Sequence, residues 1–147
     1  MNDDQPAPLP QHIWLVGGMA MLWGLYGLIN YVVAQVRMAQ YIAGKTAEEL
    51  TYFSGPSIFG HTMWVIAVLG MLSGAVFLLM RRRYAVLAYW AGFLAMIAMQ
   101  VEIVIQFGLD FFYVVSINAQ ILTTIPFVIA IGLIIYSHRM RARGVLR

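Results

Sequence analysis

The chain has 147 residues, of which 62% are hydrophobic and 10% are charged, and its formal net charge is +3. A soluble domain carries roughly 25% charged residues, and a chain of this size cannot hide so large an apolar excess in its own core. Lipid must therefore cover much of its surface, which indicates an integral membrane protein. The chain has no cysteine, which excludes disulfides, thiolate-bound metals and cysteine nucleophiles.

Four apolar segments are long enough to cross a hydrocarbon core of about 30 Å as helices. They cover residues 12–35, 60–80, 84–107 and 112–137. The fourth helix starts somewhere between Asp110 and Asn118. We expect the first segment to be a retained helix and not a signal peptide, because the residues before it include Asp3 and Asp4 but no Lys or Arg. The predicted fold is an all-α, four-helix transmembrane bundle that forms one domain over the whole chain.

The loop after the first helix contains a helix-start signal. Thr46 and Glu49 have the spacing of a capping box, in which the two side chains bond reciprocally to the amides of the first turn. A short helix from about residue 47 to 53 is therefore predicted at the outward membrane interface, between helices one and two. The stretch Ser54-Gly55-Pro56-Ser57 then ends it.

Basic residues are concentrated on one side of the predicted bundle. The loop between helices two and three and the tail after helix four hold Arg81, Arg82, Arg83, Arg139, Arg141, Arg143 and Arg147. The opposite side has Arg37 and Lys45. The positive-inside rule therefore places both termini in the cytoplasm. Lipid-facing arginines explain the basic tail without a nucleic-acid partner, so we expect no nucleic acid to bind.

Polar residues of the spans gather toward the outward side, opposite the arginines. The candidate site residues are Glu102, His61, Asn30, Gln106, Gln120 and Thr124. At 1.5 Å per residue, all of them lie within roughly 15 Å of the outward surface. Such residues often serve only as hydrogen bonds between helices, and a histidine at a helix end is often just an interfacial residue.

Glu102 is the most informative of these residues, because a carboxylate inside a span costs on the order of 2–4 kcal/mol. It shares a helical face with an alanine stripe suited to close packing in lipid, so we expect it to face the bundle. One hypothesis is a polar pocket open to the outside, in which His61 could be its ionisable partner. The alternative is a protonated carboxyl that is hydrogen-bonded to a neighbour and serves only packing.

Small residues predict where the helices touch. A small-xxx-small motif in helix two and stripes of small residues in helices one and three favour close backbone approach in lipid. The predicted packing residues are Gly24, Gly27, Gly70, Gly74, Ala95 and Ala98.

Enzymatic chemistry has the least support. His12 and His138 lie on the cytoplasmic side and His61 on the other, so no histidine pair faces one haem. There is no zinc-ligand spacing, no phosphate-binding loop, and no serine with a base and an orienting acid near it in the sequence. We therefore expect a non-enzymatic protein without a metal or cofactor.

Three stretches carry a resemblance to a known family. They are Trp23-Gly24-Leu25-Tyr26-Gly27, the segment from Trp64 to Gly74, and Arg81-Arg82-Arg83-Tyr84-Ala85. Together they resemble small four-helix bacterial inner-membrane proteins that are often loosely labelled sugar-transporter-like. The resemblance implies the same topology and a bacterial inner-membrane location, but no established activity.

Two classes of function remain open from the sequence. The first is a homo-oligomeric protein that binds or passes a small polar solute, a cation or a proton through the pocket around Glu102. The second is an accessory or assembly subunit whose small-residue stripes dock on a larger membrane complex.

Overall fold

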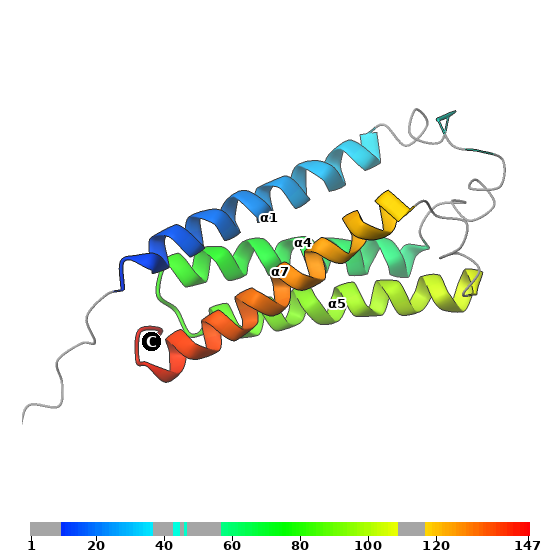
Figure 1. Ribbon diagram of the computed structural model, residues 1–147. Helices are drawn as coiled ribbons and strands as arrows, with labels where there is room; N and C mark the ends of the chain where they lie inside the picture. Colours follow the sequence, from blue (N-terminus) through cyan, green and yellow to red (C-terminus); the bar gives the residue numbers. More distant parts are fainter. Residues whose placement is uncertain (1–9, 37–42, 45, 47–56, 109–116) are drawn as a thin grey trace, which may run out of the picture.

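The computed structural model describes residues 10–36, 43–44, 46, 57–108 and 117–147, with side chains left undescribed at 107 and 117–122. Within these residues the fold consists of α1 (His12–Val36), α4 (Ile58–Leu79), α5 (Tyr84–Phe107) and α7 (Ile117–Ala142) (Figure 1). Each contains a stretch long and apolar enough to cross a membrane. The predicted all-α bundle of four membrane-spanning helices is therefore confirmed. The predicted interfacial helix and the residues just before Ile117 lie outside the described part.

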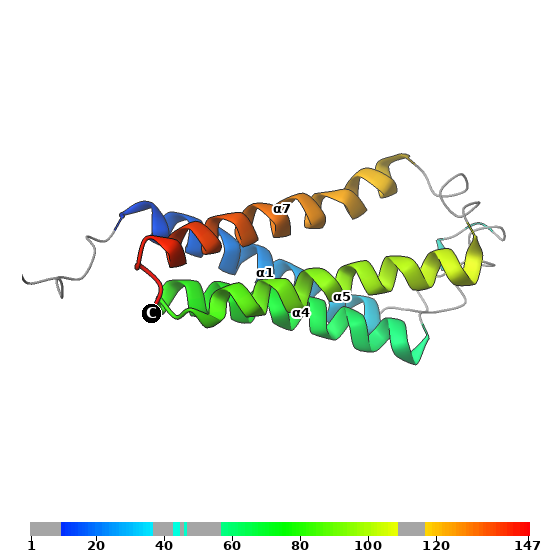
Figure 2. The same cartoon turned by 90° about the horizontal axis from the view of Figure 1, so that it is seen from below.

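The four helices run side by side with alternating direction (Figures 1 and 2). The α4–α5 hairpin is the most closely packed pair; α1 lies against α4, and α7 lies more loosely against α5. Figure 2 shows α7 diverging from α5 toward the start of α7. We call the end with the α4–α5 loop and the residues after α7 the arginine-rich end, and the opposite end the Glu102 end.

The α4–α5 hairpin is close because the two backbones touch at paired glycines. A Cβ atom added to Gly70 would lie 2.7 Å from the Cα of Gly92, which is too close for any side chain. A Cβ on Gly74, one turn further, would lie 2.6 Å from the ring of Tyr89. Since lipid removes the hydrophobic drive between helices, such close contact supplies the dispersion energy that holds them together.

The other predicted packing residues lie on several surfaces. Gly24 contacts α4, where a Cβ would lie 3.0 Å from the Cα of Leu72, whereas Gly27 is in ordinary contact distance of Val68. On α5, Ala95 is buried and Ala98 is half-buried. The predicted small-residue stripe of α1 and the small-xxx-small motif of α4 therefore contact neighbouring helices. Gly92 of α5 is a further packing glycine, which the sequence analysis does not single out.

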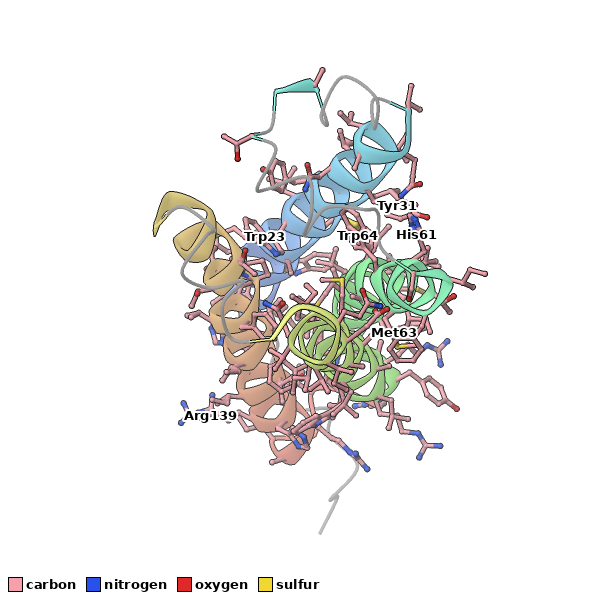
Figure 3. All side chains as sticks on the ribbon, turned by 90° about the vertical axis from the view of Figure 1, so that its right-hand side faces the viewer. Trp23, Tyr31, His61, Met63, Trp64 and Arg139 are labelled. Carbon is pink, nitrogen blue, oxygen red and sulfur yellow. The ribbon has the colours of Figure 1, made fainter. Side chains whose placement is uncertain are left out.

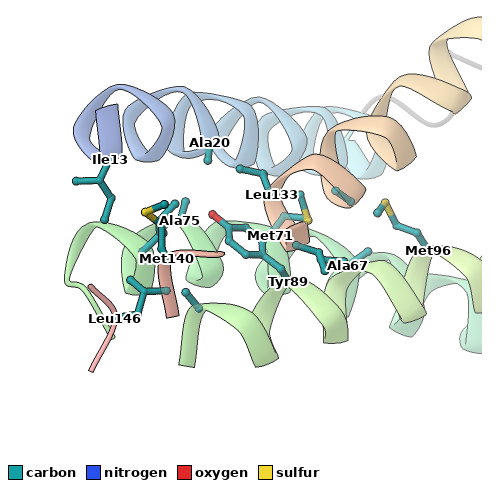
Figure 4. Close-up of a cluster of buried hydrophobic side chains, with 14 of the residues drawn as sticks. Ile13, Ala20, Ala67, Met71, Ala75, Tyr89, Met96, Leu133, Met140 and Leu146 are labelled. Carbon is teal, nitrogen blue, oxygen red and sulfur yellow. The ribbon is translucent and has the colours of Figure 1, made fainter. Parts of the chain in front are cut away.

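The apolar core occupies the half of the bundle nearer the arginine-rich end. Tyr89, Ile13 and Leu78 are fully buried there, and Figure 4 shows side chains from α1, α4, α5 and α7 meeting around the Tyr89 ring. Leu146, which follows α7, also packs into this cluster. The tightly packed half is thus opposite the half that carries Glu102.

Helix α7 ends in a Schellman motif. The amide of Val145 donates to the Met140 carbonyl at 3.0 Å, and that of Gly144 donates to the Arg141 carbonyl at 3.0 Å. Gly144 has a φ of +70°, the left-handed conformation that this motif requires and that glycine adopts without strain. Val145 and Met140 are both buried, which is the apolar contact that accompanies the motif.

Helix α4 ends in the same way, although its left-handed residue is Arg81 with a φ of +60°. The amides of Arg81 and Arg82 donate to the carbonyls of Leu78 and Phe77 at 3.0 and 2.7 Å. A non-glycine residue in this conformation costs roughly 1–2 kcal/mol. The surrounding hydrogen bonds must therefore hold the loop in place.

We predict that Gly70→Ala lowers the free energy of unfolding in detergent by about 1–3 kcal/mol, because its methyl group would force the α4 and α5 backbones apart. Gly132→Ala on α7 is the matched control, since no neighbouring atom of the described residues lies within 4 Å of a Cβ there. Thermal unfolding followed by circular dichroism measures both variants. Equal stability of the two variants would contradict the Gly70–Gly92 contact.

Candidate functional site

Glu102 lies near the end of α5, partly buried, and is held by residues of two helices. Its Oε1 accepts a hydrogen bond from the Gln106 Nε2 one turn along α5, at 2.8 Å. The same oxygen accepts a hydrogen bond from the hydroxyl of Ser57. Glu102 therefore joins the end of α5 to the start of α4.

Ser57 takes this position because it is the N-cap of α4. Its backbone is extended, with φ −60° and ψ 169°, and its Oγ accepts from the Gly60 amide at 3.1 Å. An N-cap side chain satisfies one of the amides that the first turn leaves without a helical partner. The positive end of the α4 dipole consequently lies beside the carboxyl group of Glu102, where it favours negative charge.

The donors that the described residues give to Glu102 are both neutral, one a hydroxyl and the other an amide. They fix the orientation of the carboxyl group without cancelling its charge. Arg37 and Lys45, the basic residues predicted for this side, lie outside the described residues. Chemically, a carboxyl group held in this way can attract a cation or a polar group.

His61 contacts α1 and not Glu102. Its Nδ1 accepts from the Gln35 Nε2 at 3.3 Å, and one turn further the Trp64 ring meets the Tyr31 ring edge-on at 5.2 Å. Figure 3 shows Tyr31, His61 and Trp64 grouped where α4 faces α1. The predicted His61–Glu102 pair is not among the contacts that the structure shows. The reason is rotational: His61 lies on the α1-facing side of α4, whereas Gly70 of the same helix lies against Gly92 of α5.

The remaining predicted residues are more dispersed. Asn30 on α1 and Thr124 on α7 are exposed, and the side chain of Gln120 lies outside the described residues. The structure thus brings Gln106 to Glu102. Within the described residues, no group of three or more His, Asp or Glu side chains could hold a metal ion.

Two residues of this region were missed by the sequence analysis, Ser57 and Gln35. Ser57 carried a usable signal, since a serine directly before a long apolar run is a typical N-cap. The sequence analysis assigns Ser57 only to a helix-breaking stretch. It predicts that the second helix begins at residue 60, whereas α4 begins at Ile58. Gln35 carried no signal beyond being a polar residue at the end of an apolar span.

A third side-chain hydrogen bond between helices lies on the exposed side of the other half of the bundle. The Trp90 Nε1 of α5 donates to the His138 Nε2 of α7 at 3.1 Å. His12 and Tyr136 also meet there, with ring centroids 5.8 Å apart. His12 and His138 therefore lie toward the arginine-rich end and His61 toward the Glu102 end, so the three histidines do not share a site.

The fold defines the class of protein: a small multi-pass membrane protein with four spanning helices in its described part. Comparison with known proteins adds no relative, because the chain matches no protein-family model, no curated protein and no solved structure. The resemblance to small four-helix bacterial proteins therefore stays a prediction. Any functional conclusion has to come from the geometry around Glu102.

We predict that Ser57 and Glu102 are energetically coupled. In a double-mutant cycle of Ser57→Ala and Glu102→Ala, unfolding in detergent should show a coupling free energy of about 0.5–2 kcal/mol, since the two side chains share a hydrogen bond. His61→Ala combined with Glu102→Ala is the control cycle and should be additive within about 0.5 kcal/mol. Additivity of the Ser57 cycle would show that the contact contributes no stability.

Proposed function

We propose that this protein is a non-enzymatic membrane protein that binds or passes a small cation, a proton or a small polar solute at Glu102, on the outward side of a bacterial inner membrane. The observation that carries the proposal is a partly buried carboxyl group inside an apolar span, held at one oxygen by the neutral donors Ser57 and Gln106. An acid placed in this way is suited to change its charge state or its partner.

The energetic argument rests on the cost of an ionised carboxylate at membrane depth. Such a group is stabilised when a proton neutralises it, when a cation approaches it, or when enough donors surround it. Ser57, Gln106 and the nearby start of α4 supply donors and a helix dipole, but no full positive charge. Binding of a proton or a cation would offset the rest of the cost of the carboxylate's negative charge. Such binding can be reversible, as a binding or permeation site requires.

The surroundings of Glu102 support access from outside the bundle. Gln106 is exposed and Glu102 is only partly buried, and the apolar core lies in the other half of the bundle. A solute could therefore reach the carboxyl group without unpacking Tyr89 and its neighbours.

An accessory role in a larger membrane complex is the second candidate function. It is supported by small residues that the described part of the bundle leaves uncovered: none of its atoms from another segment lies within 4 Å of a Cβ placed on Gly18 of α1 or on Gly132 of α7. Such positions suit the approach of another helix in lipid. Purification in a mild detergent separates the two functions, because a stoichiometric large partner favours the accessory role and a homo-oligomer favours the binding role.

We predict that Glu102→Gln abolishes cation- or proton-coupled flux with the fold intact, because it keeps the shape and hydrogen bonding of the side chain but removes its charge. The measurement uses proteoliposomes loaded with a pH-sensitive dye, under gradients of protons, Na⁺, K⁺ or a small organic amine. Ser57→Ala keeps the carboxyl group and should reduce flux without abolishing it. A Glu102→Gln protein with wild-type flux would remove the support for a binding role.

We also predict that the arginine-rich end faces the cytoplasm, because seven arginines lie there against Arg37 and Lys45 on the other side. Reporter fusions after Arg83 and after Arg147 should report cytoplasm, and a fusion after Glu49 should report the exterior. A fusion after Arg83 that is active on the outside would reverse the proposed orientation.

A further inference from the structure

The turn between α4 and α5 and the residues after α7 form one backbone unit, which we call the loop–tail pair (residues 81–83 and 143–147). The Arg83 amide donates to the Arg147 carbonyl at 2.9 Å, and the Arg147 amide donates to the Arg81 carbonyl at 2.9 Å. Val145 and Leu146 are buried and anchor the tail in the core. Two segments that are far apart in the sequence are therefore held side by side by their backbones, and both are rich in arginine.

The loop–tail pair has a large excess of positive charge. It contains Arg81, Arg82, Arg83, Arg143 and Arg147, and the last turn of α7 adds Arg139 and Arg141. Among the described residues the only acidic side chain is Glu102, which lies at the opposite end. Asp3 and Asp4, which the sequence predicts on the arginine-rich side, would offset two of these seven charges. The field at this end therefore favours an anion.

One hydrogen-bond donor of the loop–tail pair, in the side chain of Arg81, lacks an acceptor among the described residues. Its Nε is buried and has no hydrogen-bond partner within the described part of the chain. The backbone that carries this side chain is fixed, because the residue is held at φ +60° at the end of α4 and its carbonyl oxygen accepts from Arg147. A buried guanidinium donor without an acceptor is costly, and an anionic oxygen is the acceptor that it fits best.

We infer that the loop–tail pair binds the headgroup phosphate of an anionic phospholipid. Guanidinium groups match phosphate oxygens in paired hydrogen bonds, which ammonium groups cannot do. The pair lies at the ends of apolar spans, which is the depth of lipid headgroups. The aromatic ring of Tyr84, 5.7 Å from the guanidinium carbon of Arg83, adds an interfacial anchor beside it.

The bound phosphate would stabilise the arrangement that creates the site. Holding Arg81, Arg83 and Arg147 together leaves their like charges in repulsion, and a phosphate between them turns that repulsion into attraction. The lipid would then lock the tail against the α4–α5 turn, and through Leu146 it would strengthen the core. This inference is independent of the proposed role of Glu102, since it concerns the other end of the bundle.

The test measures lipid retention by native mass spectrometry of the full chain in mixed phosphatidylcholine and phosphatidylglycerol micelles. The wild type should bind phosphatidylglycerol at least about tenfold more tightly than phosphatidylcholine. Arg82→Gln combined with Arg83→Gln should weaken phosphatidylglycerol binding by roughly twenty-five-fold, at about fivefold for each arginine. Both side chains are exposed, so circular dichroism should show an unchanged helix content.

Arg139→Gln is the control, because this arginine is exposed and Figure 3 shows it projecting from α7 away from the other helices. It should weaken phosphatidylglycerol binding by less than about twofold. If Arg139→Gln weakened phosphatidylglycerol binding as much as the loss of one loop arginine, the inference would be overturned. The binding would then depend on the net charge of the protein and not on the position of the arginines. Equal retention of the two lipids would also overturn it.

The source of the phosphate is tested by competition at constant ionic strength. Inorganic phosphate at millimolar concentration and a short single-stranded oligonucleotide should leave phosphatidylglycerol retention unchanged. Displacement by inorganic phosphate would identify a soluble-anion site, and displacement by the oligonucleotide would identify a nucleic-acid site. Either displacement would overturn the assignment to a phospholipid.

Discussion

The contact between Gly70 and Gly92 is the constraint on which the rest of the structure depends. It lets the α4 and α5 backbones touch and so sets the rotation and register of the hairpin. A similar length of helix separates Gly70 from Ser57 and Gly92 from Gln106, so the antiparallel hairpin brings the start of α4 to the end of α5. The hydrogen bonds to Glu102 follow from that register.

The two ends of the bundle differ in packing and in chemistry. At the arginine-rich end, Tyr89 and Leu146 belong to a continuous apolar core, and the chain after α7 pairs with the α4–α5 turn. At the other end, α7 diverges from α5 (Figure 2), and Glu102 is hydrogen-bonded to Ser57 and Gln106. The bundle therefore has a firmly packed half at the arginine-rich end and a more open, more polar half at the Glu102 end.

Ser57 links stability to the proposed function. The same hydroxyl caps α4 and donates to Glu102 of α5, so the group that orients the carboxyl group also stabilises the start of the neighbouring helix. His61, four residues later, is directed to Gln35 of α1 instead. Neighbouring polar residues at one helix start therefore serve two different interfaces, and only one of them belongs to the candidate site.

The sequence by itself determined the membrane class, the four spanning helices and the small residues of α4, because span length and apolar content are properties of each segment alone. It also placed Glu102 and Gln106 on one helical face. Only the tertiary structure decided that Gly92 faces Gly70, that Ser57 donates to Glu102, and that Arg147 pairs with the turn at Arg81. These partners depend on the rotation and register of one helix against another, which arise from packing between segments and leave no periodic trace within any of them.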